Sequence, residues 1–245
     1  MDFSSRVPIY SAFFAEWAGT TKARTITFVI LSVAKDLLLP LLLPFRAERF
    51  CSLLFSLHKA SPTQIASLLA RAKSLPHNYA PPLYTQFGSK QLQVPRGYVV
   101  DRHRSQIGQG AAAFEAAKAA MRQWRHFDLG WVRVANSEAQ IQPGQIVAVE
   151  VHALGLWSLN CSRILYVIDE PERFGFGYGT TAQHVERGEE RFLLEYHPAS
   201  GALYYDLLAV SKPAHWMAQL AYPYTRSRQR KFARDSHRQM KDACR

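Results

Sequence analysis

The residues with the clearest capacity for chemistry are one histidine and two adjacent glutamates, His184, Glu189 and Glu190. They lie within and just after the connection between two candidate strands, at residues 174–180 and 190–196. A carboxylate beside a histidine fixes the tautomer of the imidazole and keeps its pKa near the working pH of a general base. The pattern therefore predicts a catalytic set in which His184 is the base and Glu189 or Glu190 orients it. The alternative is structural, with His184 a solvated turn residue and both glutamates on a charged strand edge.

Polar residues within otherwise apolar strands form a second group of candidates. A charged or hydroxyl-bearing side chain that is buried in a sheet must be paired with another polar group or must serve a ligand. Those that face a cavity are expected to orient the polar end of a bound molecule. Because strand residues alternate between two faces, the alternative is exposure on the outer face. The ligand-binding candidates are Tyr178, Thr180, Arg163, Tyr166 and Asp206, with His215 from a later segment and Glu195 and Tyr204 as further polar positions.

No motif for a metal, a nucleotide or a covalent nucleophile accompanies these residues. The glycines of FGFGYGT, residues 174–180, alternate inside a strand pattern, and no helix follows them to receive a phosphate. Cys51, Cys161 and Cys244 are far apart and lack zinc-site spacing, which indicates reduced thiols and favours a cytoplasmic location. A serine nucleophile elbow, a P-loop and an HExxH motif are also missing from the sequence. We therefore expect no metal and no cofactor.

The segments that must position the candidates follow the order strand, helix, six strands, helix. After a strand at residues 97–103, apolar residues recur at helical spacing over residues 111–126. The apolar period then changes to two, which predicts strands separated by short turns. These strands cover residues 131–135, 145–152, 161–168, 174–180, 190–196 and 202–210. Short turns join antiparallel neighbours, so we predict an α+β fold with a curved antiparallel sheet of about seven strands.

A long helix closes the chain and is expected to lie in the concave face of the sheet. Ser211 is a candidate N-cap, and Pro213 falls where the first helical turn is expected. Pro223 is expected to kink this helix or to end it. Because an apolar stripe must be buried, the helix is predicted to pack on the sheet and to complete a helix-grip domain over residues 97–243.

The residues before this domain carry weaker signals. Residues 26–45 are the most apolar part of the chain, but a charged pair and two prolines interrupt them, so we expect neither a membrane-spanning helix nor a signal peptide. Residues 1–60 have two interpretations: a poorly ordered extension, or translated sequence upstream of a misplaced start. Residues 61–96 are expected to form a short helix, with Ser61 as its N-cap, and a linker rich in proline and glycine.

The net charge of +11 is carried by the two ends of the chain. Residues 91–225 contain 12 Lys/Arg and 13 Asp/Glu, whereas residues 226–245 contain 8 and 2. Nucleic-acid readers usually carry their charge on the folded face that docks, so this distribution argues against a nucleic-acid partner. The basic C-terminal segment suits an anionic membrane surface or single-stranded RNA. The simpler alternative is a solvated helix end whose cations favour the helix dipole.

Several segments of residues 97–240 together resemble an uncharacterised protein family, family 0548, found in plants and bacteria. The segments are Gly108-Gln-Gly110 with Phe114 and Trp124, Phe174 to Thr180, His184, Gly188 to Phe192, Ser211 to His215, Tyr222-Pro-Tyr224, Arg228-Gln229 and Phe232 to Arg234. The resemblance implies a START-like, or Bet v 1-like, helix-grip fold with a cavity for an apolar small molecule. It implies no settled activity.

The leading functional prediction is binding without chemistry. The bound molecule is expected to be lipid-like or polycyclic, apolar or amphipathic, and to lie between the sheet and the C-terminal helix. The first alternative is an enzyme of cyclase, lyase or hydrolase type that uses His184 with Glu189 or Glu190. The second is a peripheral protein that reaches an anionic membrane or RNA through residues 226–245.

Overall fold

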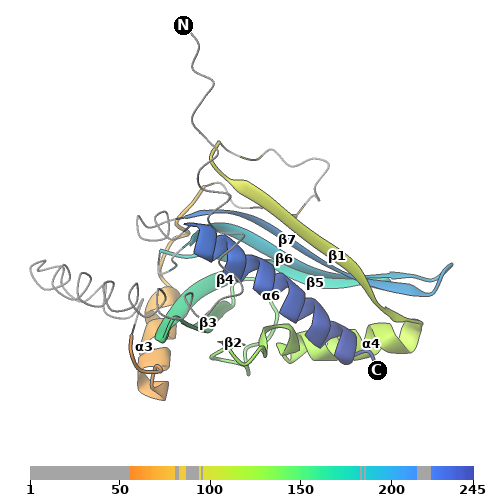
Figure 1. Ribbon diagram of the computed structural model, residues 1–245, viewed down its shortest axis with the longest axis horizontal. Helices are drawn as coiled ribbons and strands as arrows, with labels where there is room; N and C mark the ends of the chain where they lie inside the picture. The colour runs from red at the N-terminus through yellow and green to blue at the C-terminus, as the bar shows by residue number, and fades with distance from the viewer. Residues whose placement is uncertain are drawn as a thin grey trace, which may run out of the picture. The chain divides into compact units, whose positions relative to one another are not determined.

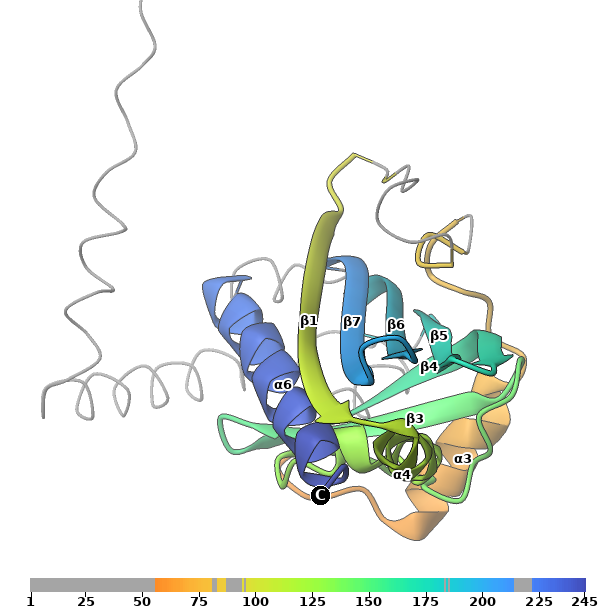
Figure 2. The same cartoon turned by 90° about the vertical axis from the view of Figure 1, so that its right-hand side faces the viewer.

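Figures 1 and 2 show the computed structural model, in which residues 56–80, 83–86, 94, 96–182, 184, 186–213 and 222–245 are described. The predictions for the N-terminal extension therefore fall almost wholly outside the described residues, and so does His215. The described residues all belong to one compact unit, Phe50–Arg245.

One antiparallel sheet of seven strands, in the order β1-β7-β6-β5-β4-β3-β2, forms the centre of this unit. Each strand predicted from the period-two pattern corresponds to one observed strand. The strands are β1 (Val99–Gln109), β2 (Val132–Val134), β3 (Ile146–Ala153), β4 (Leu156–Glu170), β5 (Arg173–Thr180), β6 (Glu186–His197) and β7 (Ala202–Pro213). Strands β2 to β7 pair with their neighbours in sequence, and β1 pairs with β7 at the other edge. The predicted α+β class and sheet are confirmed.

Helix α6 (Tyr222–Asp242) lies in the concave face of the curved sheet, beside β1 and β7 (Figures 1 and 2). The predicted grip of a C-terminal helix by the sheet is therefore confirmed. The start of this helix was predicted wrongly, because β7 continues through Pro213 and Ser211 is a strand residue paired with Gly188. Beyond Pro223 the basic helix runs on to Asp242, so this proline does not end it.

Aromatic side chains fill the space between the sheet and the helices on its concave face. The ring of Phe192 lies 5.3 Å from that of Phe127 and 5.2 Å from that of Phe176, and Phe232 of α6 lies 5.2 Å from Phe127. Tyr178 borders the same cluster, with its ring 5.5 Å from that of Phe192. Interiors of this kind are packed as densely as organic crystals. The grip is thus formed around a filled apolar core.

Helix α4 (Ala111–Arg122) ends four residues before the predicted end at residue 126. Trp124 has a φ of +60° and turns the chain into the 3₁₀ helix η3 (Arg125–Phe127). The indole Nε1 donates a hydrogen bond of 2.9 Å to the carbonyl of Ala139, which fixes this conformation. As a result Trp124, His126 and Phe127 all enter the core, which a continuous helix does not permit at this spacing.

Helix α3 (Pro62–Ala72) covers the convex face of β3 and β4. It begins with a capping box in which Ser61 and Gln64 exchange hydrogen bonds. Leu68 and Ala72 pack against a second apolar cluster formed by Ile146, Ala148, Leu159 and Cys161. Strand β3 was predicted to be half-buried, and its valines do face the concave core. Its other face is also buried, with Ala148 at 0% and Glu150 at 1% exposure, because α3 and the residues before it cover that side.

The segment after α3 was predicted to be a linker, but its described part lies along the convex face of the sheet. We call residues 75–80 and 83–86 the strap. The Asn78 amide donates to the carbonyl of Glu186 over 2.8 Å, and the Ala182 amide donates to Pro76 over 3.1 Å. The strap is therefore bonded to the strands that it crosses.

No helix of the described segments is long and apolar enough to cross a membrane.

Candidate functional site

Strand β6 places its adjacent glutamates on opposite faces of the sheet. Glu190 shares the concave face with Phe192 and Leu194, which belong to the aromatic core. Glu189 shares the convex face with Arg191, and both are buried although neither belongs to that core. This is the alternation that an extended strand imposes. The two carboxylates therefore have different neighbours and different roles.

On the convex face, Glu189 fastens the strap to the sheet. Its carboxylate accepts hydrogen bonds from the Tyr79 hydroxyl at 2.9 Å, the Leu83 amide, the Thr85 amide at 3.0 Å and the Thr85 hydroxyl at 3.1 Å. A carboxylate has about four acceptor positions. Four donors occupy these positions, so Glu189 has a structural task.

A buried ion network adjoins this clamp. The Asp206 carboxylate accepts from Arg191 at 2.9 Å and from both the Nε and a terminal nitrogen of Arg102, at 2.9 and 2.8 Å. Arg191 also donates to the carbonyl of Thr85 over 3.2 Å, and the Thr85 hydroxyl lies 2.8 Å from that of Tyr166. Burial raises the pKa of Tyr166 to about 12. Two predicted ligand-binding residues, Tyr166 and Asp206, are thus placed as structural partners beneath the strap.

Two more of the predicted ligand-binding residues, Arg163 and Thr180, form hydrogen bonds with the end of α3 and with the strap. Arg163 donates to the carbonyls of Ala72, Lys73 and Leu75 over 2.8–3.2 Å, at the end of α3. The Thr180 hydroxyl donates to Asn78 of the strap over 2.6 Å. Both residues were assigned to a ligand because their partners could not be predicted from the sequence. Residues 75–80 show neither helical nor strand periodicity, so nothing in the sequence indicated that this segment contacts the sheet.

The alternating glycines of β5 are explained by what lies on the convex face. A Cβ on Gly177 would lie 2.4 Å from the Tyr166 ring, and one on Gly179 would lie 2.1 Å from the Tyr79 hydroxyl. These contacts are shorter than any real side chain tolerates. Glycine is needed here because tyrosines of β4 and the strap lie directly on the strand.

The concave face carries a different polar group, where β6 meets the start of the described part of α6. The Tyr178 hydroxyl donates to Glu190 over 2.7 Å, from the directly opposite position on β5. Glu186 lies on the same face of β6 and accepts from the Gln229 amide over 2.8 Å. Arg226 pairs with Asp101 of β1 and donates to Gln229 over 2.7 Å. We call the set Tyr178, Glu186, Glu190, Asp101, Arg226 and Gln229 the β6–α6 site.

Gly188 separates the two carboxyl groups of this site along β6. Its φ is +146°, and a Cβ there would lie 1.9 Å from the Val210 carbonyl of β7. Any other residue would push the strands apart at this point. The glycine therefore keeps Glu186 and Glu190 on one continuous face.

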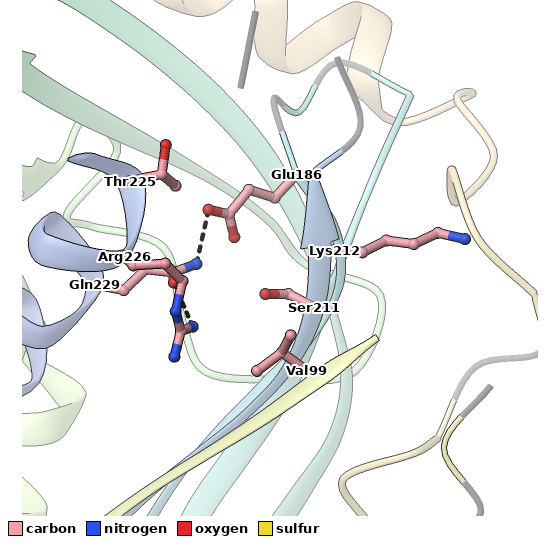
Figure 3. A pocket seen from close by; sticks show the side chains of 7 residues that line it. All are labelled: Val99, Glu186, Ser211, Lys212, Thr225, Arg226 and Gln229. Atoms are coloured by element: carbon pink, nitrogen blue, oxygen red, sulfur yellow. Dashed lines mark hydrogen bonds between the residues drawn. The ribbon is translucent and has the colours of Figure 1, made fainter. Parts of the chain in front are cut away.

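A small pocket opens between β7 and α6 within this site (Figure 3). Gln229 and Arg226 approach it from α6, and Glu186, Ser211 and Val99 approach it from the strands, while Lys212 extends away. Its volume is about 10 Å³, which is room for one water-sized group. The described residues therefore offer a polar pocket for an end group, well short of the few hundred cubic ångströms that enclose a whole small molecule.

Burial controls the ionisation of this site. It raises the pKa of Glu190 to about 7, an effect that the Tyr178 hydrogen bond opposes and that the charges of Glu186 and Asp101 reinforce. Burial also raises the pKa of Glu186, which hydrogen bonds from Gln229 and Ser211 oppose. A carboxyl group with a pKa near neutrality exchanges protons readily at physiological pH, so Glu190 is suited to donate or accept one.

His184 lies in the connection that leads into β6. Its Nδ1 accepts a hydrogen bond of 3.0 Å from the backbone amide of Glu186, and burial lowers the pKa of its ring to about 4. Among the described residues, no carboxylate is hydrogen bonded to this ring. The structure separates Glu189 from Glu190 by the thickness of the sheet, so the pairing of His184 with either stays a prediction, with Glu190 on the side of the pocket.

Four members of the β6–α6 site were missed in the sequence: Asp101, Glu186, Arg226 and Gln229. The spacing Glu186-x-Gly188-x-Glu190 was a usable signal, since residues two apart face the same side of a strand. The partners on β1 and α6 gave none, because their proximity depends on sheet order and on how the helix lies in it.

Replacing Tyr178 by phenylalanine is expected to raise the pKa of Glu190 above about 7, because the lost hydrogen bond stabilises the charged carboxylate. The titration can be followed by ¹³C NMR of protein labelled at the glutamate carboxyl carbons. The matched control is Tyr196→Phe, a tyrosine of β6 whose ring stacks on Phe114. An unchanged or lowered pKa of Glu190 in the Tyr178 variant would contradict the assignment.

Fold and site together define an α+β helix-grip domain with a polar site at one end of its gripped helix. The family model described as a domain of unknown function, DUF1990, matches residues 83–239, and the chain belongs to this family. The resemblance to family 0548 is confirmed by relatives that carry that name. The chain is 41% identical over 152 residues to the UPF0548 protein of Dictyostelium discoideum, covering 58% of this chain and 70% of the relative. It is 37% identical over 192 residues to the UPF0548 protein of Deinococcus radiodurans, covering 74% and 94%.

Solved structures give a weaker likeness. The crystal structure of Ara h 8.0201 is 13% identical, with a TM-score of 0.39 over 59% of this chain and 98% of that one. A likeness of this size carries no conclusion about activity. What the chain does must therefore be argued from the site itself.

Proposed function

We propose that this chain binds a small amphipathic molecule at the β6–α6 site, with a hydroxyl or ammonium end group in the pocket beside Glu186. The observation that carries this is the difference between neighbouring carboxylates. Among the described residues, Glu189 accepts four hydrogen bonds, whereas Glu190 accepts one, from Tyr178. Glu186 shares the concave face with Glu190 and lines the pocket, so a donor from outside the chain can reach a carboxylate on this face.

The size of the pocket restricts the molecule. A space of about 10 Å³ admits a hydroxyl or a primary ammonium, but not a ring or an alkyl chain. The adjoining core is filled by Phe176, Phe192 and Phe232. We therefore place the apolar remainder of the molecule outside that core, unlike the enclosed lipid-like or polycyclic ligand that the sequence suggested.

Native mass spectrometry of the full chain, purified gently from its own host, tests this function directly. We expect an adduct of small-molecule mass on the wild-type protein and its loss from Glu186→Gln, because the amide has no negative charge and replaces one acceptor oxygen by a donor. The control is Glu172→Gln, an exposed position in the turn before β5. The proposal fails if the wild type carries no adduct, or if Glu186→Gln retains it as fully as the control.

A second function, acid–base catalysis on the same molecule, is favoured by one observation. The pKa of Glu190 at about 7 matches a general acid or base at physiological pH, and Tyr178 holds it in place. This agrees with the cyclase, lyase or hydrolase alternative, with Glu190 as the acting carboxyl group. If it holds, Glu190→Gln should retain an adduct of different mass from the wild type, namely the unreacted molecule. Adducts of identical mass on the two proteins would contradict catalysis, and only the binding function would remain.

A further inference from the structure

The outer face of α6 carries a row of exposed basic side chains. Arg230, Arg234, Arg238 and Lys241 are exposed, whereas Ala233, Ser236 and Met240 of the same helix are buried against the sheet. Residues three and four apart lie on one side of a helix, so the four form a line about 17 Å long. We call these four residues the basic row.

The acidic residues of the same helix do not neutralise this row. Asp235 pairs with Lys231 and accepts from the Trp131 indole over 3.0 Å, and Asp242 pairs with Arg245 over 3.2 Å. In the part of the chain that the structure describes, no ion pair involves any member of the basic row. The charge of Arg238 also acts on Asp235, but the row has four cations and keeps most of its positive charge, which is suited to bind a partner of opposite charge.

The apolar side of α6 is buried against the sheet, which limits how the helix can contact a charged partner. Phe232 packs on Phe127 with ring centroids 5.2 Å apart, and Ala233 and Met240 are buried in the core. The helix cannot insert an apolar face into a lipid layer without leaving the sheet. Contact through the basic row is therefore electrostatic and superficial.

The Trp131 ring, which packs beside α6, is not available to nucleic-acid bases. Arg228 lies 3.9 Å from the ring centroid of Trp131, and Lys231 lies 5.0 Å from it, so cations of α6 cover this ring. Single-stranded nucleic acid binds through aromatic platforms as well as charge. Among the residues that the structure describes, no member of the basic row lies over an aromatic ring, and such a line of cations fits the headgroups of an anionic membrane better than it fits RNA.

We infer that the basic row docks this protein, reversibly and by charge alone, on membranes rich in anionic lipid. Each basic residue near such a surface strengthens binding about fivefold, so removal of three should weaken it by about a hundredfold. The docked protein would keep the sheet, and with it the β6–α6 site, outside the lipid layer.

The test uses the full chain and sedimentation with phosphatidylcholine vesicles that contain about 30% phosphatidylserine. We expect the wild type to bind these vesicles, to ignore pure phosphatidylcholine, and to be released by added salt. The triple variant Arg230→Gln, Arg234→Gln, Arg238→Gln should bind about a hundredfold more weakly. The matched control removes the same charge from exposed positions elsewhere: Arg71→Gln, Lys73→Gln, Arg187→Gln.

Each other outcome overturns the inference. Equal loss in both triple variants would mean that net charge matters and the row does not. Binding of the wild type to single-stranded RNA more tightly than to the vesicles, lost in the first variant, would assign the row to nucleic acid. No vesicle binding by the wild type would remove the docking surface altogether. Thermal melts of both variants that match the wild type ensure that the comparison is between folded proteins.

Discussion

Replacing Glu189 by alanine is expected to lower the free energy of unfolding by about 3–5 kcal/mol, because it leaves several buried donors without an acceptor. The Tyr79 hydroxyl and the two strap amides lose their partner together with the Thr85 hydroxyl. Burial and the charge of Glu189 raise the pKa of Tyr79 far above its usual range, so the hydroxyl remains a donor at every pH of interest. Urea denaturation with linear extrapolation measures the effect.

A local readout separates release of the strap from general destabilisation. Hydrogen exchange at the Thr85 amide should accelerate more than exchange at amides in the centre of β6, since the strap opens before the sheet does. Glu138→Ala, at an exposed loop position, is the control and should change stability by no more than about 0.5 kcal/mol. A loss below about 1 kcal/mol in Glu189→Ala would show that the strap is not held by this carboxylate.

The sequence predicted the fold well because its signals are local. The change of apolar period after residue 126 and the turns such as residues 197–201, which close with a hydrogen bond from Gly201 to His197, define strands one after another. Antiparallel hairpins then follow with little choice of topology. The ends of elements were less well predicted, as at Ser211, where a capping residue type occurs inside a strand that its neighbour β6 prolongs.

The candidate site was predicted less well because its contacts are remote in sequence. Tyr79 and Glu189 are 110 residues apart, and the strap has neither helical nor strand periodicity. The predicted strand began at Glu190, so Glu189 was not assigned to a face, and which face the strap covers is decided by tertiary structure. A charged residue in an apolar strand therefore predicts a polar partner, but the sequence does not show whether that partner belongs to the chain or to a ligand.

The two faces of the sheet differ in whether their charged residues have partners within the chain. On the convex face, Asp206, Arg191 and Glu189 have their partners within the chain and hold the strap down. On the concave face, Glu186 lines a pocket, and Glu190 accepts a single hydrogen bond from within the part of the chain that the structure describes. Counting the donors that each carboxylate receives thus separates structural charge from charge that remains open for function.

Burial of His126 in the core is expected to make the folded protein less stable in acid. His126 is 0% exposed, and neither ring nitrogen has a hydrogen-bond partner among the described residues. Its neighbours are aromatic rings, with Phe127 at 4.8 Å and Phe192 at 4.9 Å between centroids. Burial lowers the pKa of this imidazole to about 3 from 6.5. The folded protein therefore holds His126 neutral in a pH range where the unfolded chain protonates it.

The sign of the effect follows from proton linkage. Between pH 6.5 and about 3 the unfolded state binds a proton that the folded state refuses, so stability is present above pH 6.5 and is lost as the pH falls. The loss attributable to His126 between pH 6.5 and pH 4.5 is about 3 kcal/mol, at about 1.4 kcal/mol per pH unit. His184, whose pKa is lowered to about 4, acts in the same direction, whereas the raised pKa of Glu190 acts in the opposite one.

Because these groups overlap, the informative quantity is the difference between two proteins. His126→Phe keeps an aromatic ring in the cluster and removes the titrating nitrogens, so its stability should fall by about 3 kcal/mol less than that of the wild type on going from pH 7 to pH 4.5. Urea denaturation at the two pH values measures the loss of stability in the wild type and in the variant. His58→Phe, at an exposed position, should follow the wild type. If the His126 variant loses as much stability in acid as the wild type does, the imidazole is protonated within the folded core, and its burial among the rings does not make the fold sensitive to acid.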